Sequence, residues 1–214
     1  MLDPRDIALQ AACPVVAAPR FGQLATMDAG QRIVLAANGV FVEVKLSWLS
    51  CLVRVGSTHR KLALPYGDVQ ERVEFAFGMI PRRLVTAFVE EGRRRLPNEL
   101  AGGLIYSSKS GLLRLRLFEE QYVDQCRVDY RMPALASDEV LAVDLHTHGG
   151  APAYFSSDDD HDDKGFKVAG VFGNLDAVNP SARFRLVIGG FFVPLPNPWE
   201  RDTACLQEPC VAGK

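Results

Sequence analysis

Residues 140–159 read VLAVDLHTHGGAPAYFSSDD, an apolar run that ends in two histidines and continues into a segment rich in serine and aspartate. The apolar run predicts a buried strand. Because alternate side chains of a strand share a face, His146 and His148 point the same way, about 6.5–7 Å apart at Cα. Only four histidines occur in the chain, and two of them have the spacing that lets both rings bind one metal ion. The alternative is two incidental histidines at the end of a core strand.

A second polar group, Ser156 and Asp159, follows His148 after seven intervening residues. Residues three apart lie on one face of a helix, so both side chains can face the same point. Ser-x-x-Asp is also the pattern of a capped helix start, and this pattern alone favours the capping interpretation. Together with the histidines, however, it supplies a carboxylate and a hydroxyl. Two imidazoles and one carboxylate would leave the fourth position of a zinc ion open for water.

Further polar side chains surround this pattern. Asp144 shares the predicted strand face of the histidines, where it can orient an imidazole or simply lie near a sheet edge. Residues 158–163 and His161 are additional potential ligands. We interpret them mostly as the solvated start of a short helix over 156–166.

The flanking sequence predicts an α/β domain with a mixed sheet at 79–198. Pro81 opens a helix with an apolar stripe that includes Phe88, and the helix ends in three arginines before Pro97. The segment 119–137 is mixed in character. The predicted strands are 100–107, 112–118, 140–148, 167–172 and 183–193.

The N-terminal part predicts a small β-rich domain over 1–78, with no chemistry that identifies its role. Residues 1–20 are expected to be irregular, and the lone histidine there, His59, is read as a solvated loop residue. Asn38-Gly39 is a strong hairpin-turn signal between strands at 31–36 and 40–45. A further strand is expected at 48–55, and residues 199–214 form a tail.

Composition excludes several classes of protein. The 214 residues are 48% hydrophobic and 23% charged, with a formal net charge of −2, so no strong global field favours nucleic acid or an anionic membrane. No signal peptide or membrane-spanning apolar stretch is apparent. The five cysteines form no C-x-x-C pair. We therefore expect free thiols and a cytoplasmic protein.

The spacing H-x-H-x7-S-x-x-D resembles the motif of the JAMM (MPN/JAB) zinc metalloprotease family. This family also has a glutamate just after its first helix, and Glu99 occupies that place here. The resemblance covers about residues 80–195 and implies a cytidine-deaminase-like mixed sheet flanked by helices. It implies Zn²⁺ bound by His146, His148 and Asp159, with Glu99 as the catalytic acid/base and Ser156 stabilising the oxyanion.

One departure concerns the residues after the second histidine. The family usually has proline there, whereas this chain has Gly149-Gly150, from which we expect a more flexible loop over the site.

The order of domains resembles the bacterial PRTRC system protein A family, whose cassettes encode ParB-related and ThiF-related proteins. That resemblance implies cleavage of a peptide or isopeptide bond beside the C-terminus of a ubiquitin-like protein, with a ThiF/E1-like protein as a further partner. An alternative is a JAMM-fold module that binds such a partner, or acts as a scaffold in plasmid maintenance, without cutting.

A different metal enzyme also has to be weighed, because residues 144–148 (DLHTH) resemble the opening motif of PHP phosphoesterases and amidohydrolases. Those folds need several later histidines. Only His161 follows here, and too few residues remain for a barrel.

Overall fold

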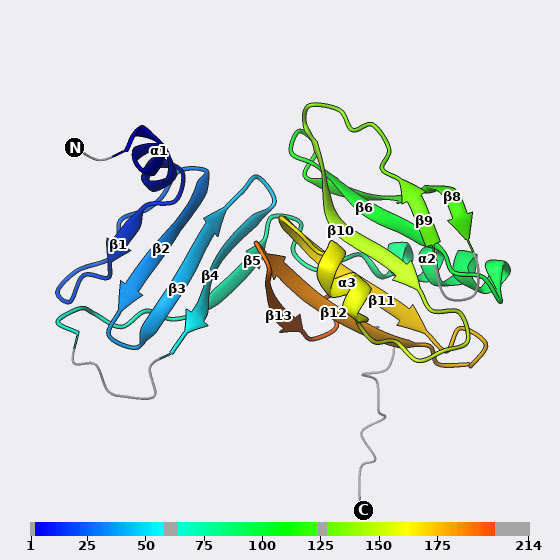
Figure 1. The fold of residues 1–214 in the computed structure, drawn as a ribbon. Coiled ribbons are helices and arrows are strands. Elements are labelled where there is room, and N and C mark those ends of the chain that lie inside the picture. The colour runs from blue at the N-terminus through cyan, green and yellow to red at the C-terminus, as the bar shows by residue number, and fades with distance from the viewer. Residues whose placement is uncertain (1–2, 58–63, 124–127, 200–214) are drawn as a thin grey trace, which may run out of the picture. The chain divides into compact units, whose positions relative to one another are not determined.

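The computed structural model describes residues 3–57, 64–123 and 128–199 (Figure 1). His59 and the tail from residue 200 onward lie outside these ranges. The chain divides into two compact units, one of residues 1–78 with the turn 108–111 and one of the remainder. No helix among the described residues has the length and apolar character needed to span a bilayer.

The N-terminal unit contains a short helix and a five-stranded sheet of order β1-β2-β3-β4-β5. β1 pairs with β2 in parallel, and the other neighbours are antiparallel. The bounds are α1 Pro4–Ala12, β1 Val15–Ala17, β2 Gly30–Ala36, β3 Gly39–Lys45, β4 Leu49–Gly56 and β5 Arg72–Phe75.

The expectation that residues 1–20 are irregular is wrong. The side chain of Asp3 caps α1 by accepting from the backbone N–H of Arg5, and Pro4 fits the first helical position. β1 is ordered by its pairing with β2, which is a contact that the local sequence does not encode. The hairpin at Asn38-Gly39 is confirmed, with Ala36 paired to Gly39.

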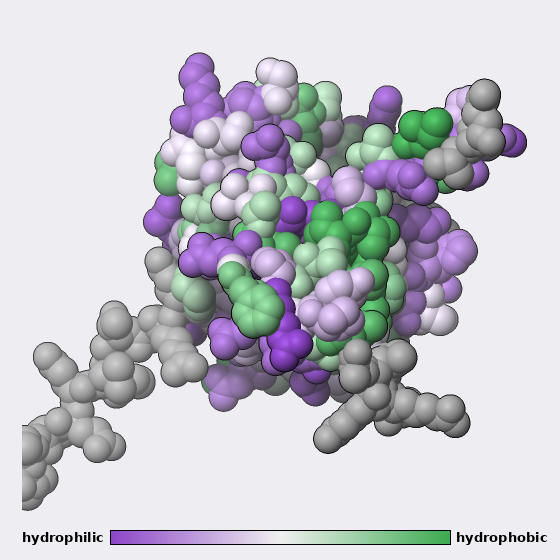
Figure 2. All heavy atoms as spheres, turned by 90° about the vertical axis from the view of Figure 1, so that its left-hand side faces the viewer, coloured by the Kyte–Doolittle hydropathy of each residue, from purple (hydrophilic) through white to green (hydrophobic). Residues whose placement is uncertain are grey.

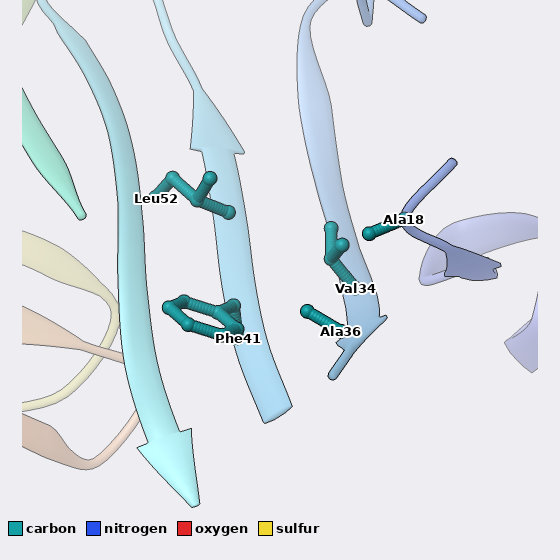
Figure 3. Close-up of a cluster of buried hydrophobic side chains, with 5 residues drawn as sticks. All are labelled: Ala18, Val34, Ala36, Phe41 and Leu52. Atoms are coloured by element: carbon teal, nitrogen blue, oxygen red, sulfur yellow. The ribbon is translucent and has the colours of Figure 1, made fainter. Parts of the chain in front are cut away.

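The core of this unit combines an apolar cluster with a buried ion pair. Figure 3 shows the cluster, which consists of Ala18, Val34, Ala36, Phe41 and Leu52. Beside it on the sheet, the buried side chains of Arg32 and Glu43 form an ion pair 2.6 Å long. The second Glu43 oxygen accepts from Arg72 at 2.7 Å, so the buried carboxylate is paired on both sides.

Exposed apolar side chains also occur in this unit. On the face turned to the viewer in Figure 2, hydrophobic residues lie among hydrophilic ones. Phe21 is 94% exposed, and Ile7, Leu9 and Val15 are also largely exposed. Scattered exposed apolar residues are usual on folded proteins and do not by themselves mark a binding surface.

The second unit is built on a six-stranded mixed sheet of order β13-β12-β11-β10-β6-β7, and a separate two-stranded sheet pairs β8 with β9. The predicted α/β fold is confirmed. The bounds are α2 Arg82–Arg95, β6 Ala101–Ser107, β7 Leu112–Leu117, β8 Glu119–Val123, β9 Val128–Arg131, β10 Glu139–Thr147, α3 Ser157–Asp162, β11 Phe166–Gly173, β12 Ser181–Ile188 and β13 Phe191–Leu195.

One predicted strand of this unit is wrong. The segment 183–193 is not a single strand, because the chain reverses at Gly189 and Gly190 between β12 and β13. Both glycines have positive φ, 54° and 95°, which glycine adopts without steric cost. Pro194 lies within β13, an edge strand of this sheet, where its missing N–H is tolerated.

The parallel pairing of β10 with β11 positions the candidate site. His146 pairs with Val171, and the strands run in the same direction. A parallel pair needs a long connection that returns the chain to the starting end. Here that connection is residues 148–165, and it includes α3, which Figure 1 shows between β10 and β11 along the chain. The crossover therefore carries the serine and aspartates back over the histidine face.

Candidate metal centre

His146, His148 and Asp159 come together as one group. One potential ligand atom from each residue lies within 4.8 Å of those from the other two. The two Nε2 atoms of the histidines are 3.2 Å apart, and His146 Nε2 lies 3.3 Å from Asp159 Oδ1. The strand brings the histidines to one face, as the sequence predicts, and the crossover brings the aspartate.

The ring environment favours the form of histidine that binds metals. Burial lowers the pKa of His146, although the nearby carboxylate of Asp159 opposes this change. His146 therefore tends towards the neutral form, in which a ring nitrogen has a free lone pair. On His148, Nδ1 lies 3.4 Å from the carbonyl oxygen of Pro152. That contact favours a proton on Nδ1 and leaves Nε2 facing the other two groups.

Asp159 has two structural tasks at once. Ser156 is the N-cap of α3, and its hydroxyl oxygen accepts from the Asp159 N–H at 3.1 Å. In return, Asp159 Oδ2 accepts from both the N–H and the hydroxyl of Ser156, each at 2.7 Å. The second oxygen, Oδ1, remains directed at His146. Capping and metal binding, weighed as alternatives from the sequence, are thus compatible in one carboxylate.

Glu99 lies at the start of the strand that neighbours the histidines. Ala101 on β6 pairs with His146 on β10 in an antiparallel register. Continuing that register by two residues places Glu99 opposite His148 on the same face of the sheet. Glu99 is 7% exposed, which is unusual for a glutamate. The position suits a proton-transfer group, whereas the alternatives Glu90 and Glu91 lie inside α2.

Asp144 pairs with residues other than the histidines. Its Oδ2 accepts from Lys167 Nζ at 2.7 Å, and the Tyr130 hydroxyl lies 3.3 Å from the same oxygen. Burial and the Asp144 charge together raise the pKa of Tyr130. Among the described contacts, Asp144 therefore pairs with a lysine and a tyrosine and makes no hydrogen bond to His146.

The acidic run after Ser156 is only partly a solvated helix start. Asp163 is 8% exposed and is paired with Arg185 at 2.6 Å and with Lys167 at 2.8 Å. Asp160 also pairs with Arg185. The solvated interpretation is therefore wrong for Asp163, whose partner Arg185 lies 22 residues further along the chain, whereas the Asp160 side chain is 52% exposed and pairs with Arg185 at the surface. The exposed His161 lies outside the metal-competent group found among the described residues.

The Gly149-Gly150 loop is a hydrogen-bonded turn. The Ala151 N–H donates to the His148 carbonyl at 2.9 Å, and the Leu175 N–H donates to the Gly149 carbonyl at 2.9 Å. Gly149 has a φ of 53°, and a Cβ there would lie 2.9 Å from the Pro97 oxygen. The first glycine is thus required by backbone shape and by a close approach.

The donor set fits zinc. Zinc bonds of about 2.0–2.2 Å in a tetrahedral site place neighbouring ligand atoms about 3.3–3.5 Å apart. Two of the three donor pairs, His146–His148 and His146–Asp159, have separations of 3.2 and 3.3 Å, which agree with that geometry. Two imidazoles and one carboxylate are a donor set typical of catalytic zinc, which keeps one position open.

Sequence reasoning missed two side chains beside this group. The ring of Tyr154 packs edge-on against His148, with centroids 4.6 Å apart, and Tyr154 is 54% exposed. The only sequence feature that could have indicated Tyr154 was its position between His148 and Ser156. Arg185 lies 22 residues beyond Asp163, so no local pattern predicts that contact.

Comparisons with known proteins bear on the same region. A family model described as prokaryotic homologs of the JAB domain matches residues 81–187, and a domain of unknown function, DUF2016, matches residues 3–76. A search of curated proteins found no match. A solution structure of a protein from Desulfitobacterium hafniense is similar with 15% identity and a TM-score of 0.35. That match covers 54% of this chain and 87% of the other.

Proposed function

We propose that this chain, which belongs to the family of prokaryotic homologs of the JAB domain, is a zinc-dependent peptidase or isopeptidase. The observation that carries the proposal is the meeting of His146, His148 and Asp159, with their donor atoms within 4.8 Å of one another. Two imidazole nitrogens 3.2 Å apart, one of them also 3.3 Å from a carboxylate oxygen, are the arrangement expected of side chains that share one cation. The buried Glu99, two residues before the strand that pairs with β10, is the group we propose for the proton transfer that hydrolysis requires.

The proposed roles follow from where each group lies. His146, His148 and Asp159 would hold the metal through Nε2, Nε2 and Oδ1. A zinc ion held there would supply a lowered pKa for its bound water, towards 7, and polarisation of a carbonyl group. Glu99, which lies two residues before β6, would take a proton from the attacking water and give it to the leaving amine.

Ser156 has a role that the hydrogen bonds make more specific. Its hydroxyl donates to Asp159 Oδ2, so in this arrangement it orients the ligand carboxylate. To stabilise an oxyanion as well, the hydroxyl has to turn its proton from Asp159 towards the substrate. A donor that meets a developing oxyanion is worth roughly 3–4 kcal/mol. Ser156→Ala therefore removes an orienting contact and, in the proposed reaction, an oxyanion donor.

The substrate class is proposed by family analogy alone. We propose a peptide or isopeptide bond next to the C-terminus of a ubiquitin-like protein, with a ThiF/E1-like cassette partner. The resemblance to PRTRC system protein A in domain order supports this choice. A module of the same fold that binds the partner without cutting is the competing function, and the experiment below separates the two.

The decisive experiment measures zinc by mass spectrometry in purified wild-type protein, His148→Ala and Asp159→Ala. We expect about one zinc per chain in the wild type and loss in both variants. His161→Ala is the matched control, because it removes an exposed histidine of α3 outside the group. Glu99→Gln should keep zinc and lose cleavage of a ubiquitin-like C-terminal amide. A wild type that takes up no zinc after reconstitution would leave the binding module as the better account.

A further inference from the structure

The helix that carries Asp159 has no apolar anchorage. α3 is six residues long, and none of its residues is buried. Most surface helices are held by an apolar face, and so short a helix is unstable by itself. Some other interaction must therefore fix α3 over the sheet, and with it the position of Asp159 relative to His146.

Arg185 of β12 supplies that interaction. Its Nε and Nη2 both donate to Asp163 Oδ2, at 2.9 and 2.6 Å, and its Nη1 donates to Asp160. The guanidinium also stacks on Phe155 and Phe192, 3.8 and 3.9 Å from the ring centroids. Arg185 thus contacts the chain before, within and directly after α3. We call Arg185, Asp160 and Asp163 the α3 anchor.

The Arg185–Asp163 pair of the anchor is buried, and a cation from a second strand supports it. The side chains of Arg185 and Asp163 are 7% and 9% exposed, so solvent and salt screen this pair weakly. Lys167 of β11 donates to the other Asp163 oxygen at 2.8 Å and to Asp144 of β10 at 2.7 Å. The carboxylate of Asp163 is therefore held by cations from two adjacent strands, which defines where α3 ends.

We propose that Arg185 is a positioning residue that sets the place of Asp159 and thereby the zinc affinity of the site. The inference rests on the proposed function, since it presumes the zinc site. Asp159 lies next to Asp160 and one helical turn before Asp163, so both anchor points hold its turn of helix. Groups that orient metal ligands typically change metal affinity by about 10–100-fold when removed.

The shape of the guanidinium matters as much as its charge. Arginine presents a rigid planar fork that can contact two carboxylates while it stacks on aromatic rings. Lysine has one compact ammonium group and cannot reproduce both contacts at once. A purely electrostatic role would thus be rescued by Arg185→Lys, whereas a positioning role would be rescued only in part.

The experiment measures zinc affinity by competition with a chromophoric chelator, and cobalt(II) absorption as a report on ligand geometry. We expect Arg185→Met to bind zinc about 10–100-fold more weakly than the wild type, with Arg185→Lys between them. The cobalt spectrum of Arg185→Met should show changed coordination. Arg183→Met is the matched control on the same strand, because Arg183 is exposed and, among the described contacts, forms no hydrogen bond or ion pair with α3. Its zinc affinity should equal that of the wild type.

Two further results make the test decisive. If Arg185→Met does not fold, Asp160→Asn decides, because the Asp160 side chain is 52% exposed and the variant removes only part of the anchor. Weaker zinc binding by Asp160→Asn supports the inference. Folded Arg185→Met or Asp160→Asn with wild-type zinc affinity overturns it and leaves the proposed function intact. A wild type without zinc binding overturns both.

Discussion

Replacing Gly149 by alanine should destabilise the protein through the backbone. Gly149 follows His148 with a φ of 53°, in the left-handed region. An L-residue in left-handed helical geometry costs roughly 1–2 kcal/mol. The new Cβ would also lie 2.9 Å from the backbone oxygen of Pro97, which has to move by a few tenths of an ångström. Pro97 lies in the segment before Glu99, so this movement acts on both sides of the candidate site.

The two contributions together lower the free energy of unfolding by about 2 kcal/mol. For a chain of this size, a change of 1 kcal/mol moves Tm by roughly 2–4 °C, so we expect a fall of about 4–8 °C. Thermal unfolding followed by circular dichroism measures the change. Both proteins should be scanned in a chelator, because a metal that binds only the folded state raises the apparent Tm.

The neighbouring Gly150 provides a control, because alanine there should raise or keep Tm instead of lowering it. A Cβ at Gly150 would meet only Asp176, at an ordinary distance of 3.8 Å, and Gly150 has no positive φ. Gly-to-Ala changes at compatible positions stabilise proteins by about 0.4–1 kcal/mol, because the unfolded chain loses conformational freedom. Gly150→Ala should therefore keep or raise Tm. Equal falls in Tm for the two variants would refute the reasoning from φ and the Pro97 contact.

Two more predictions concern the N-terminal unit. Burial raises the pKa of the Cys51 thiol to about 11, so peptide-resolved alkylation at pH 8 should label the partly exposed Cys13 and spare Cys51. Because the folded state keeps this proton longer than the unfolded state, stability falls as pH rises from about 9 to 11, by on the order of 2 kcal/mol relative to Cys51→Ala. Glu43→Ala strands the buried Arg32 and should lower the free energy of urea unfolding by about 3–5 kcal/mol, whereas removing the exposed Glu74 should change it little. A similar loss from both glutamate variants would show that the buried pair is not the cause.

Elements with strong local signals were predictable. The apolar run before His146 and the capping pattern at Ser156 are encoded over a few residues, and each forms where expected. α2 likewise begins after Pro81 and ends at Arg95. The strand parity of the histidines and the spacing to Asp159 were enough to predict which side chains meet. Their roles in binding and catalysis remain predictions.

The remaining features depend on contacts between distant residues. β1 forms a strand because it pairs in parallel with β2. β5 is likewise ordered by its antiparallel pairing with β4. The break between β12 and β13 was hidden because apolar residues flank the pair Gly189-Gly190 on both sides. The pairing of Asp163 with Arg185 joins residues from a helix end and a strand, and neither residue signals the other in the sequence.

The helix start at α3 illustrates how a distant contact settles an ambiguous local code. Ser156 with Asp159 and Ser157 with Asp160 are two overlapping copies of one capping pattern, shifted by a single residue. The two capping patterns should stabilise a helix start almost equally. Only the pattern that begins at Ser156, however, places Asp159 against His146. The pairing of Asp160 with Arg185 occupies the carboxylate that the second copy would need. The contact of Asp160 with β12 is thus consistent with the first copy of the pattern, in which Asp159 rather than a neighbouring aspartate faces His146.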